Sequence, residues 1–268
     1  MRTVLLLGGV VSFSLAAPTA VAAAECNRQN LLDAADAYVA AQTAGSAEPL
    51  QKFLASAASY AENNQDTDIK KGVVATALKI DHRRTNVDMI ACATYTELVS
   101  TGTPPYVLGT QIHHDADGKV KLIDTIASTT NAWIFDAKKT LSYIEGEKWD
   151  PIPEAKWDSR AAIQAAGDAY LDLWSNATAV DAIPWGTPCT RLEGSAYTGK
   201  GKPDDSCKPG IPSNHNQAPN SHRRYVIDQS MGSVSIFCVW EHMMKAADSH
   251  EFRLENGKLR YVHTMTVW

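Results

Sequence analysis

Hydrophobic and polar positions along this chain follow one order twice, a helical pattern and then a series of strand patterns. Apolar side chains recur at helical spacing over residues 31–39 and again over residues 163–174. Strand patterns follow each helix, and over residues 259–267 apolar and polar positions alternate with the period of a half-buried strand. The chain therefore predicts two successive units, each with its helices before its strands.

Matching segments occur in the same order in both halves, at a nearly constant offset. The pairs are Asp-Ala-Tyr at 36–38 and 168–170, His-Arg-Arg-x-x-(Val/Ile)-Asp at 82–88 and 222–228, and the strands after Gly118 and Gly257. Collinear matches of this kind indicate an internal duplication. The offset grows between helix and strands, which places a net insertion in the second half and predicts a loop over residues 185–220.

Helices followed by a sheet that wraps over them predict an α+β fold: two tandem cone-shaped domains, each with helices packed in a curved antiparallel sheet. We expect a signal peptide over residues 1–24, a first domain over 25–145, a packed linker over 146–158 and a second domain over 159–268. Asp158 or Ser159 can cap the second opening helix.

The first 24 residues have the features of a secretory signal. A basic start at Arg2 precedes an apolar run and a small-residue stretch that ends at Ala24. The run is shorter than the roughly 20 residues that a bilayer span needs. We therefore expect a protein that is secreted or resides in the lumen of the secretory pathway, without a membrane segment after cleavage.

Cysteine usage fits that compartment. The chain has five cysteines. We expect a Cys189–Cys207 disulfide across a polar loop and a Cys26–Cys92 disulfide at the N-terminus, with Cys238 as a buried free thiol. Asn176 begins a glycosylation sequon. The cysteine spacing does not suit a zinc site, and we expect no bound metal.

Charge and motifs disfavour several classes of function. The net charge is −5 at pH 7 and no basic stripe is present, so nucleic acid is not an expected partner. The motifs of zinc proteases, serine hydrolases, P-loop proteins and dinucleotide-binding proteins are all missing from the sequence. We expect an enzyme without a cofactor, or a binding protein.

Four segments carry a resemblance to a known family. They are PYVLGTQI (105–112), PWGTPCTRLEG (184–194), HRRYVID (222–228) and DSHEFR (248–253). With them the chain resembles secreted fungal proteins that have two tandem cone-fold units of the SnoaL or nuclear-transport-factor type. This family includes the cofactor-free hetero-Diels–Alderases of tropolonic sesquiterpenoid biosynthesis.

The resemblance implies a reaction and its substrates. Such enzymes dehydrate a hydroxylated tropolone precursor to a quinone methide and join it to a humulene-type sesquiterpene, so the implied partners are an aromatic polyketide and a terpene. The alternative is a secreted, non-catalytic protein that binds small hydrophobic ligands. Fold likeness alone does not decide between them.

Duplication helps to rank candidate catalytic residues, because a feature present in only one half is more informative than a shared one. His263 takes the place of Asp124 in the repeat, and related cone folds keep acid–base groups on the concave face of the sheet. It is our first catalytic candidate; the alternative is a hydrogen-bonded core histidine. His250 is the second, on the strand face it shares with Phe252.

Arg191 is the third catalytic candidate, because a guanidinium held near a disulfide suits an anionic tropolonate oxygen. Its alternative role is a salt bridge to Glu193. Aromatic side chains of the second half are the candidates for substrate binding: Trp185, Tyr197, Trp240 and Tyr261. The duplicated His-Arg-Arg segments are interpreted as framework, with an arginine paired to an aspartate.

Overall fold

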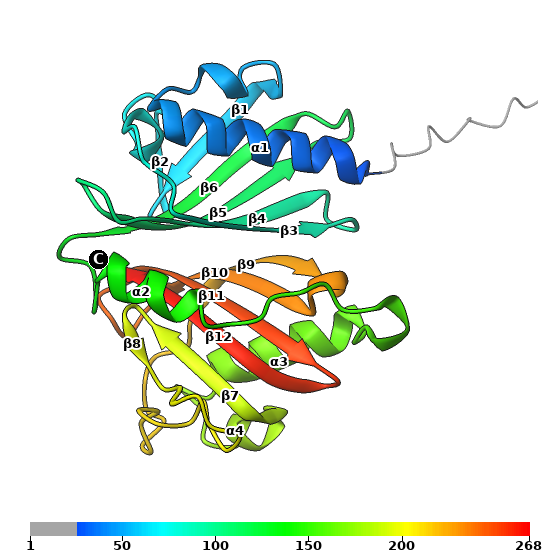
Figure 1. Ribbon diagram of the computed structural model, residues 1–268, viewed down its shortest axis with the longest axis vertical. Coiled ribbons are helices and arrows are strands. Elements are labelled where there is room, and N and C mark those ends of the chain that lie inside the picture. The colour runs from blue at the N-terminus through cyan, green and yellow to red at the C-terminus, as the bar shows by residue number, and fades with distance from the viewer. Residues whose placement is uncertain (1–25) are drawn as a thin grey trace, which may run out of the picture.

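The computed structural model describes residues 26–268 of the 268-residue chain (Figure 1). The signal peptide expected over residues 1–24 lies outside the described residues. Within residues 26–268, no helix is both long and apolar enough to cross a membrane.

The first half of the chain forms a lobe with one long helix and one sheet. Its elements are α1 (Arg28–Ala44), the 3-10 helices η1 (Glu48–Leu50) and η2 (Val73–Ala75), and strands β1 (Leu54–Glu62), β2 (Gln65–Thr67), β3 (His82–Asp88), β4 (Ala93–Ser100), β5 (Tyr106–His114) and β6 (Val120–Thr129). The Asn27 side chain caps α1, and Gly45 ends it with φ 63°.

The second half repeats this arrangement after a connection that contains α2 (Ala137–Ile144) and η3 (Glu154–Lys156). The elements of the second lobe are α3 (Arg160–Asp172), α4 (Ala179–Ala182), β7 (Trp185–Glu193), β8 (Ala196–Tyr197), β9 (Ser221–Asp228), η4 (Gln229–Met231), β10 (Ser233–Trp240), β11 (Ala246–Glu255) and β12 (Lys258–Val267). Ser159 caps α3, one of the two predicted capping residues.

The two sheets have the same topology. Each has six strands, ordered β2-β1-β6-β5-β4-β3 in the first lobe and β8-β7-β12-β11-β10-β9 in the second. This confirms the predicted α+β class with two tandem domains. One detail differs from the expected antiparallel sheet, because β1 pairs with β6, and β7 with β12, in parallel.

The loop predicted over residues 185–220 is wrong at its start, since residues 185–193 form β7. Parallel pairing with β12 fixes this segment as a strand, a long-range contact that local sequence does not display. The insertion lies instead between β8 and β9, where residues 198–220 correspond to residues 68–81 of the first lobe.

The two sheets face one another, and α1 and α3 lie on their outer sides (Figure 1). Three apolar clusters fill these layers: one under α1 around Tyr38, one under α3 around Tyr170, and one between the sheets that includes Tyr95, Phe237 and Met265. Helix α2 contributes Ala137 and Ile144 to the layer between the sheets. Both faces are thus buried along inner strands such as β4 and β11, whereas the edge strand β2 is exposed.

Repeated ion pairs join helix to sheet in each lobe. Arg83 of β3 donates to Asp36 of α1 at 2.5 Å, and Arg223 of β9 donates to Asp168 of α3 at 2.8 Å. The interpretation of the duplicated segments as framework therefore holds for Arg83 and for its counterpart Arg223.

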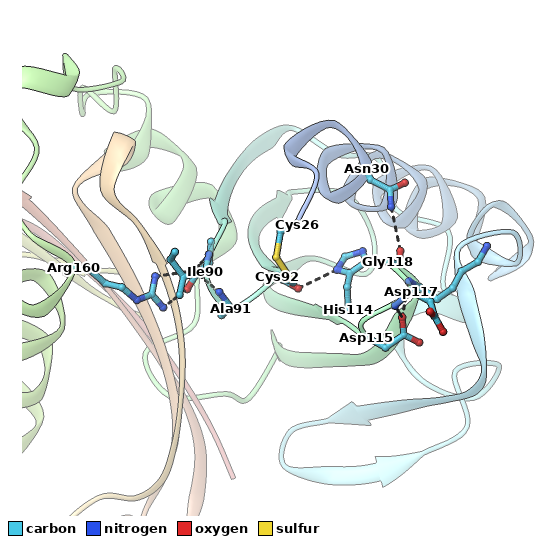
Figure 2. Close-up of a disulfide and its surroundings, with 12 residues drawn as sticks. Cys26, Asn30, Ile90, Ala91, Cys92, His114, Asp115, Asp117, Gly118 and Arg160 are labelled. Carbon is cyan, nitrogen blue, oxygen red and sulfur yellow. Dashed lines mark hydrogen bonds and ion pairs between the residues drawn. A yellow bond between two sulfur atoms is a disulfide. The ribbon is translucent and has the colours of Figure 1, made fainter. Parts of the chain in front are cut away.

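Both expected disulfides form. Cys26–Cys92 ties the start of α1 to the turn between β3 and β4 (Figure 2), and Cys189–Cys207 ties β7 to the inserted loop. The remaining thiol, Cys238, is free and buried. Bridges of this kind are typical of proteins that mature in an oxidising compartment. Asn176 is exposed, and its glycosylation stays a prediction.

Candidate functional site

His263 lies between the two sheets rather than inside the second cone. On β12, Val262 packs under α3, whereas Met265 belongs to the layer between the sheets. His263 shares the face of Met265 and is 2% exposed. The predicted alternation along β12 is correct. The expected position of His263 on the concave face is wrong, because its side chain lies on the other face of the sheet, which packs against the first lobe.

Two carboxylates hold the His263 imidazole. Nδ1 lies 2.9 Å from Glu97 Oε1 on β4, and Nε2 lies 2.7 Å from Glu147 Oε2 in the linker. Burial alone lowers the pKa of His263, but Glu147 and Glu97 together raise it to about 10. At neutral pH the ring is therefore an imidazolium that donates to both carboxylates.

A buried arginine completes this network. Arg84 of β3 forms an ion pair with Glu97 at 2.8 Å and donates a hydrogen bond to Glu251, while Asn86 donates to Glu251 at 2.6 Å. Glu97, Glu251 and His263 are close enough to suggest metal ligands. The Arg84 guanidinium already contacts both carboxylates, and both His263 nitrogens are engaged. The cluster therefore fits an ion-pair network and does not fit a metal centre.

Glu147 connects this network to a surface cavity of about 430 Å³. The cavity is lined by Gly146, Glu147, Pro188, Thr190, Tyr197, Gly201, Lys202, Pro203, Asp205, Arg260 and Tyr261. Two predicted binding residues, Tyr197 and Tyr261, are among these lining residues. His263 is not, and it reaches the cavity only through the Glu147 carboxylate.

The Glu147 carboxylate is held by several donors, although it comes from a linker. Trp149 Nε1 donates to Oε2 at 2.9 Å, and the hydroxyls of Tyr197 and Thr190 donate to Oε1, each at 3.2 Å. Its side chain is only 1% exposed. Burial alone raises the pKa of Glu147, but His263, the Trp149 N–H and Arg84 together outweigh it and lower that pKa. Glu147 is thus an oriented, ionised carboxylate.

Hydrogen bonds hold the loop that forms one wall of the cavity. The Cys189 N–H donates to the Asp205 carbonyl at 2.8 Å, beside the Cys189–Cys207 disulfide. The Asp205 carboxylate accepts from the backbone N–H groups of Lys200 and Lys202. Burial and the nearby Glu147 carboxylate raise the pKa of Tyr197 to about 12, so its hydroxyl stays protonated as a donor.

Arg191 lies in the interior of the second cone, away from this cavity. Its guanidinium donates to the Tyr170 hydroxyl at 3.1 Å and to the Pro209 carbonyl at 2.5 Å, and it pairs with Glu193 at 3.1 Å. The salt bridge to Glu193 is the alternative role that the sequence left open.

His250 shares that interior with two further candidates. Nδ1 lies 2.5 Å from Asp248, and the ring stacks on Trp240 with centroids 5.4 Å apart. Trp185 packs edge-on against Tyr170, with ring centroids 6.2 Å apart. The predicted site residues therefore form two groups, one in the cone and one at the cavity.

Sequence reasoning missed Glu147, Glu97, Trp149 and Arg84. Glu147 and Trp149 lie in a segment interpreted as a linker, and Arg84 lies in the duplicated framework segment. Glu97 and His263 are 166 residues apart, so no local spacing joins them. The expectation of a packed linker over residues 146–158 was the one available signal.

Comparisons with known proteins cover mainly one lobe. The family described as "Domain of unknown function (DUF8021)" matches residues 156–266. No curated protein matches the chain. Solved structures with similarity include AusH from Aspergillus nidulans, at 13% identity and TM-score 0.32, over 41% of this chain and 90% of AusH. AclR from Streptomyces galilaeus is similar at 10% identity and TM-score 0.28, over 48% of this chain and 92% of AclR.

Proposed function

We propose that this protein is a small-molecule enzyme that uses acid–base chemistry at the cavity beside Glu147. The observation that carries the proposal is the Glu147 carboxylate, buried, ionised and held by His263, Trp149 and Tyr197 at a cavity of about 430 Å³. Small-molecule sites commonly enclose about 300–1,000 Å³ and combine apolar walls with a few fixed polar groups.

Glu147 acts as a general base in this proposal. Its lowered pKa keeps it ionised at neutral pH and makes it a weak base, which suits a substrate with an acidic hydroxyl proton. His263 does not touch the substrate, and it positions Glu147. Arg260 and Lys202 line the same cavity and can hold the anion that proton removal leaves. Arg191 and His250 support the second cone.

The family resemblance supplies the finer reaction. Loss of water from a hydroxylated tropolone precursor transfers the ring hydroxyl proton to Glu147. The departing hydroxide takes a proton from the Tyr197 hydroxyl and leaves as water, and Tyr197 regains a proton from Glu147, whose Oε1 lies 3.2 Å away. The resulting quinone methide adds to the alkene, with one new C–C and one new C–O bond. Holding both reactants together can contribute about 7–11 kcal/mol to such a step.

A binding protein without catalysis is the second candidate. The mutual pairing of Glu147 and His263 supports it, because such a pair can simply stabilise a polar cavity wall. The presence of two titratable groups in contact, Glu147 and Tyr197, favours the enzyme.

Substitution of Glu147 tests the proposal. We expect Glu147→Gln to lower product formation from a hydroxymethyl tropolone and humulene by about 100-fold or more, since a positioned base contributes about 10²–10⁴-fold. Binding of the tropolone should change little. Glu145→Gln, at an exposed position nearby, is the matched control.

A Glu147→Gln variant that keeps full activity would contradict the role of Glu147. A wild-type protein that binds the tropolone without converting it would favour the binding function instead.

A further inference from the structure

The layer between the sheets has two ends that the duplication makes equivalent. In the second lobe, Leu192 is the register partner of both His263 and Tyr197. In the first lobe, Ala61 is the register partner of both Asp124 and Asp66. Asp124 therefore corresponds to His263, and Asp66 corresponds to Tyr197. By the same duplication, Arg224 corresponds to Arg84.

The linker covers only one of these ends. There, the indole ring of Trp149 lies over the Arg84 guanidinium, 3.6 Å from its central carbon, and donates its N–H to the Glu147 carboxylate at 2.9 Å. The chain thus supplies an aromatic ring that covers an arginine, with a hydrogen bond from that ring to a carboxylate. Arg84 is only 7% exposed as a result of this cover and of its burial between the lobes.

The equivalent end is an open cleft of about 350 Å³ between the lobes. Its lining includes Asn64, Asp66, Leu122, Asp124, His222 and Arg224. The Arg224 side chain is 28% exposed, four times the value for Arg84. The arginine that Trp149 covers therefore has its counterpart here without a tryptophan over it, and the Phe237 ring lies 5.7 Å from the central carbon of that guanidinium.

Hydrogen bonding at this cleft is incomplete. Asp124, whose side chain is 4% exposed, accepts from Arg224 Nε through Oδ2 at 2.6 Å. Its Oδ1 has no hydrogen-bond partner within residues 26–268. Asp66 adds a second carboxylate to the cleft. With two carboxylates and one arginine, the cleft favours a ligand that donates hydrogen bonds.

We propose that this cleft is a second ligand site, which binds a flat aromatic molecule carrying an N–H or O–H group. The ring covers the Arg224 guanidinium as Trp149 covers Arg84, and the donor group bonds the Asp124 carboxylate as the indole N–H bonds Glu147. An arginine–aromatic contact and a charge-assisted hydrogen bond together define this specificity.

Indole and 1-benzofuran are suitable probes, because they have the same shape and only indole has the N–H donor. Calorimetric titration of the purified protein should show indole binding about tenfold more tightly, as expected for a hydrogen bond to a carboxylate. Ala61→Phe places a ring in the cleft and should weaken indole binding by tenfold or more. Ala57→Phe, at an exposed position of the same strand, should leave it unchanged.

Equal affinity for the two probes would overturn the hydrogen-bond assignment. Indole binding that Ala61→Phe does not weaken would overturn the site itself. Arg224→Lys keeps the charge without the planar surface, and we expect it to weaken indole binding several-fold even if Ala61→Phe folds poorly. Unchanged binding to a folded Arg224→Lys protein would contradict the proposal.

Discussion

Asp88 and Asp228 bind the two lobes together reciprocally. The Asp88 carboxylate accepts a hydrogen bond from the Ile227 N–H at 2.8 Å, and the Asp228 carboxylate accepts one from the Val87 N–H at 2.7 Å. Each aspartate thus bonds to the residue that precedes the other. Equivalent residues of the two lobes thus contact each other reciprocally, as in a two-fold symmetric dimer interface, although both lobes belong to one chain.

The two aspartates differ in their arginine partners. Arg160, at the start of α3, donates two hydrogen bonds to Asp88, at 2.7 and 2.6 Å, and Figure 2 shows it reaching the turn next to Cys92. Arg28, at the start of α1, is 3.8 Å from Asp228. The ion pair at Asp88 is therefore the tighter of the two.

Loss of the Asp88 carboxylate should destabilise the whole protein. Because the group is buried and paired, we expect Asp88→Ala to lower the free energy of unfolding by about 3–5 kcal/mol. Chemical denaturation measures this. Asp117→Ala, at an exposed turn, is the control, and equal stability of both variants would contradict the structural role of Asp88.

Replacement of His263 should cost stability as well as activity. His263→Gln leaves the Glu97 and Glu147 carboxylates without their shared cation, and we expect a loss of about 3–5 kcal/mol in unfolding free energy. His242→Gln, at an exposed position, serves as the control. A stable His263→Gln protein would show that the ion pairs contribute little.

The stability of the protein should depend on pH through His263. Its pKa is raised in the folded state from the usual 6.5 to about 10, so the protonated ring stabilises the fold fully below pH 6.5. That contribution is lost as the pH rises toward 10. Thermal melts should show a decline over this interval in the wild type and a smaller one in His263→Gln. Identical declines would contradict the raised pKa.

Removal of the Trp149 ring should create a second indole site. We expect Trp149→Ala to lose less stability than the about 3–5 kcal/mol that fully buried aromatics lose, because its indole is half-buried. Added indole should then restore part of the melting temperature by covering Arg84 again. Trp157→Ala, which removes a more exposed indole of the linker, should respond to indole only as the wild type does, through the cleft at Arg224.

The Cys189–Cys207 disulfide should support ligand binding at the Glu147 cavity. The bridge closes a loop with a sequence separation of 18 residues and holds the wall that contains Asp205. We expect Cys189→Ser with Cys207→Ser to cost about 3 kcal/mol in stability and to weaken substrate binding several-fold. Cys238→Ser, at the free thiol, is the control for the loss of a sulfur atom. Unchanged substrate affinity in the double variant would show that the bridged loop does not contribute to substrate binding.

The sequence by itself determined the duplication, the α+β order, the alternation along β12 and both disulfide pairs. These features depend on local periodicity or on residue identity, which a linear reading detects. Residues 82–88 and 222–228, for example, identify equivalent strands without any knowledge of their neighbours.

Only the tertiary structure decided which face of each sheet His263, Arg84 and Glu97 occupy. A two-residue period separates the faces of a strand, but it does not say which face meets the helix and which meets the other lobe when both are buried. The position of Glu147 was equally hidden, because a linker has no periodicity. Its carboxylate meets His263 only because the two sheets pack face to face and the linker crosses one end of the layer between them.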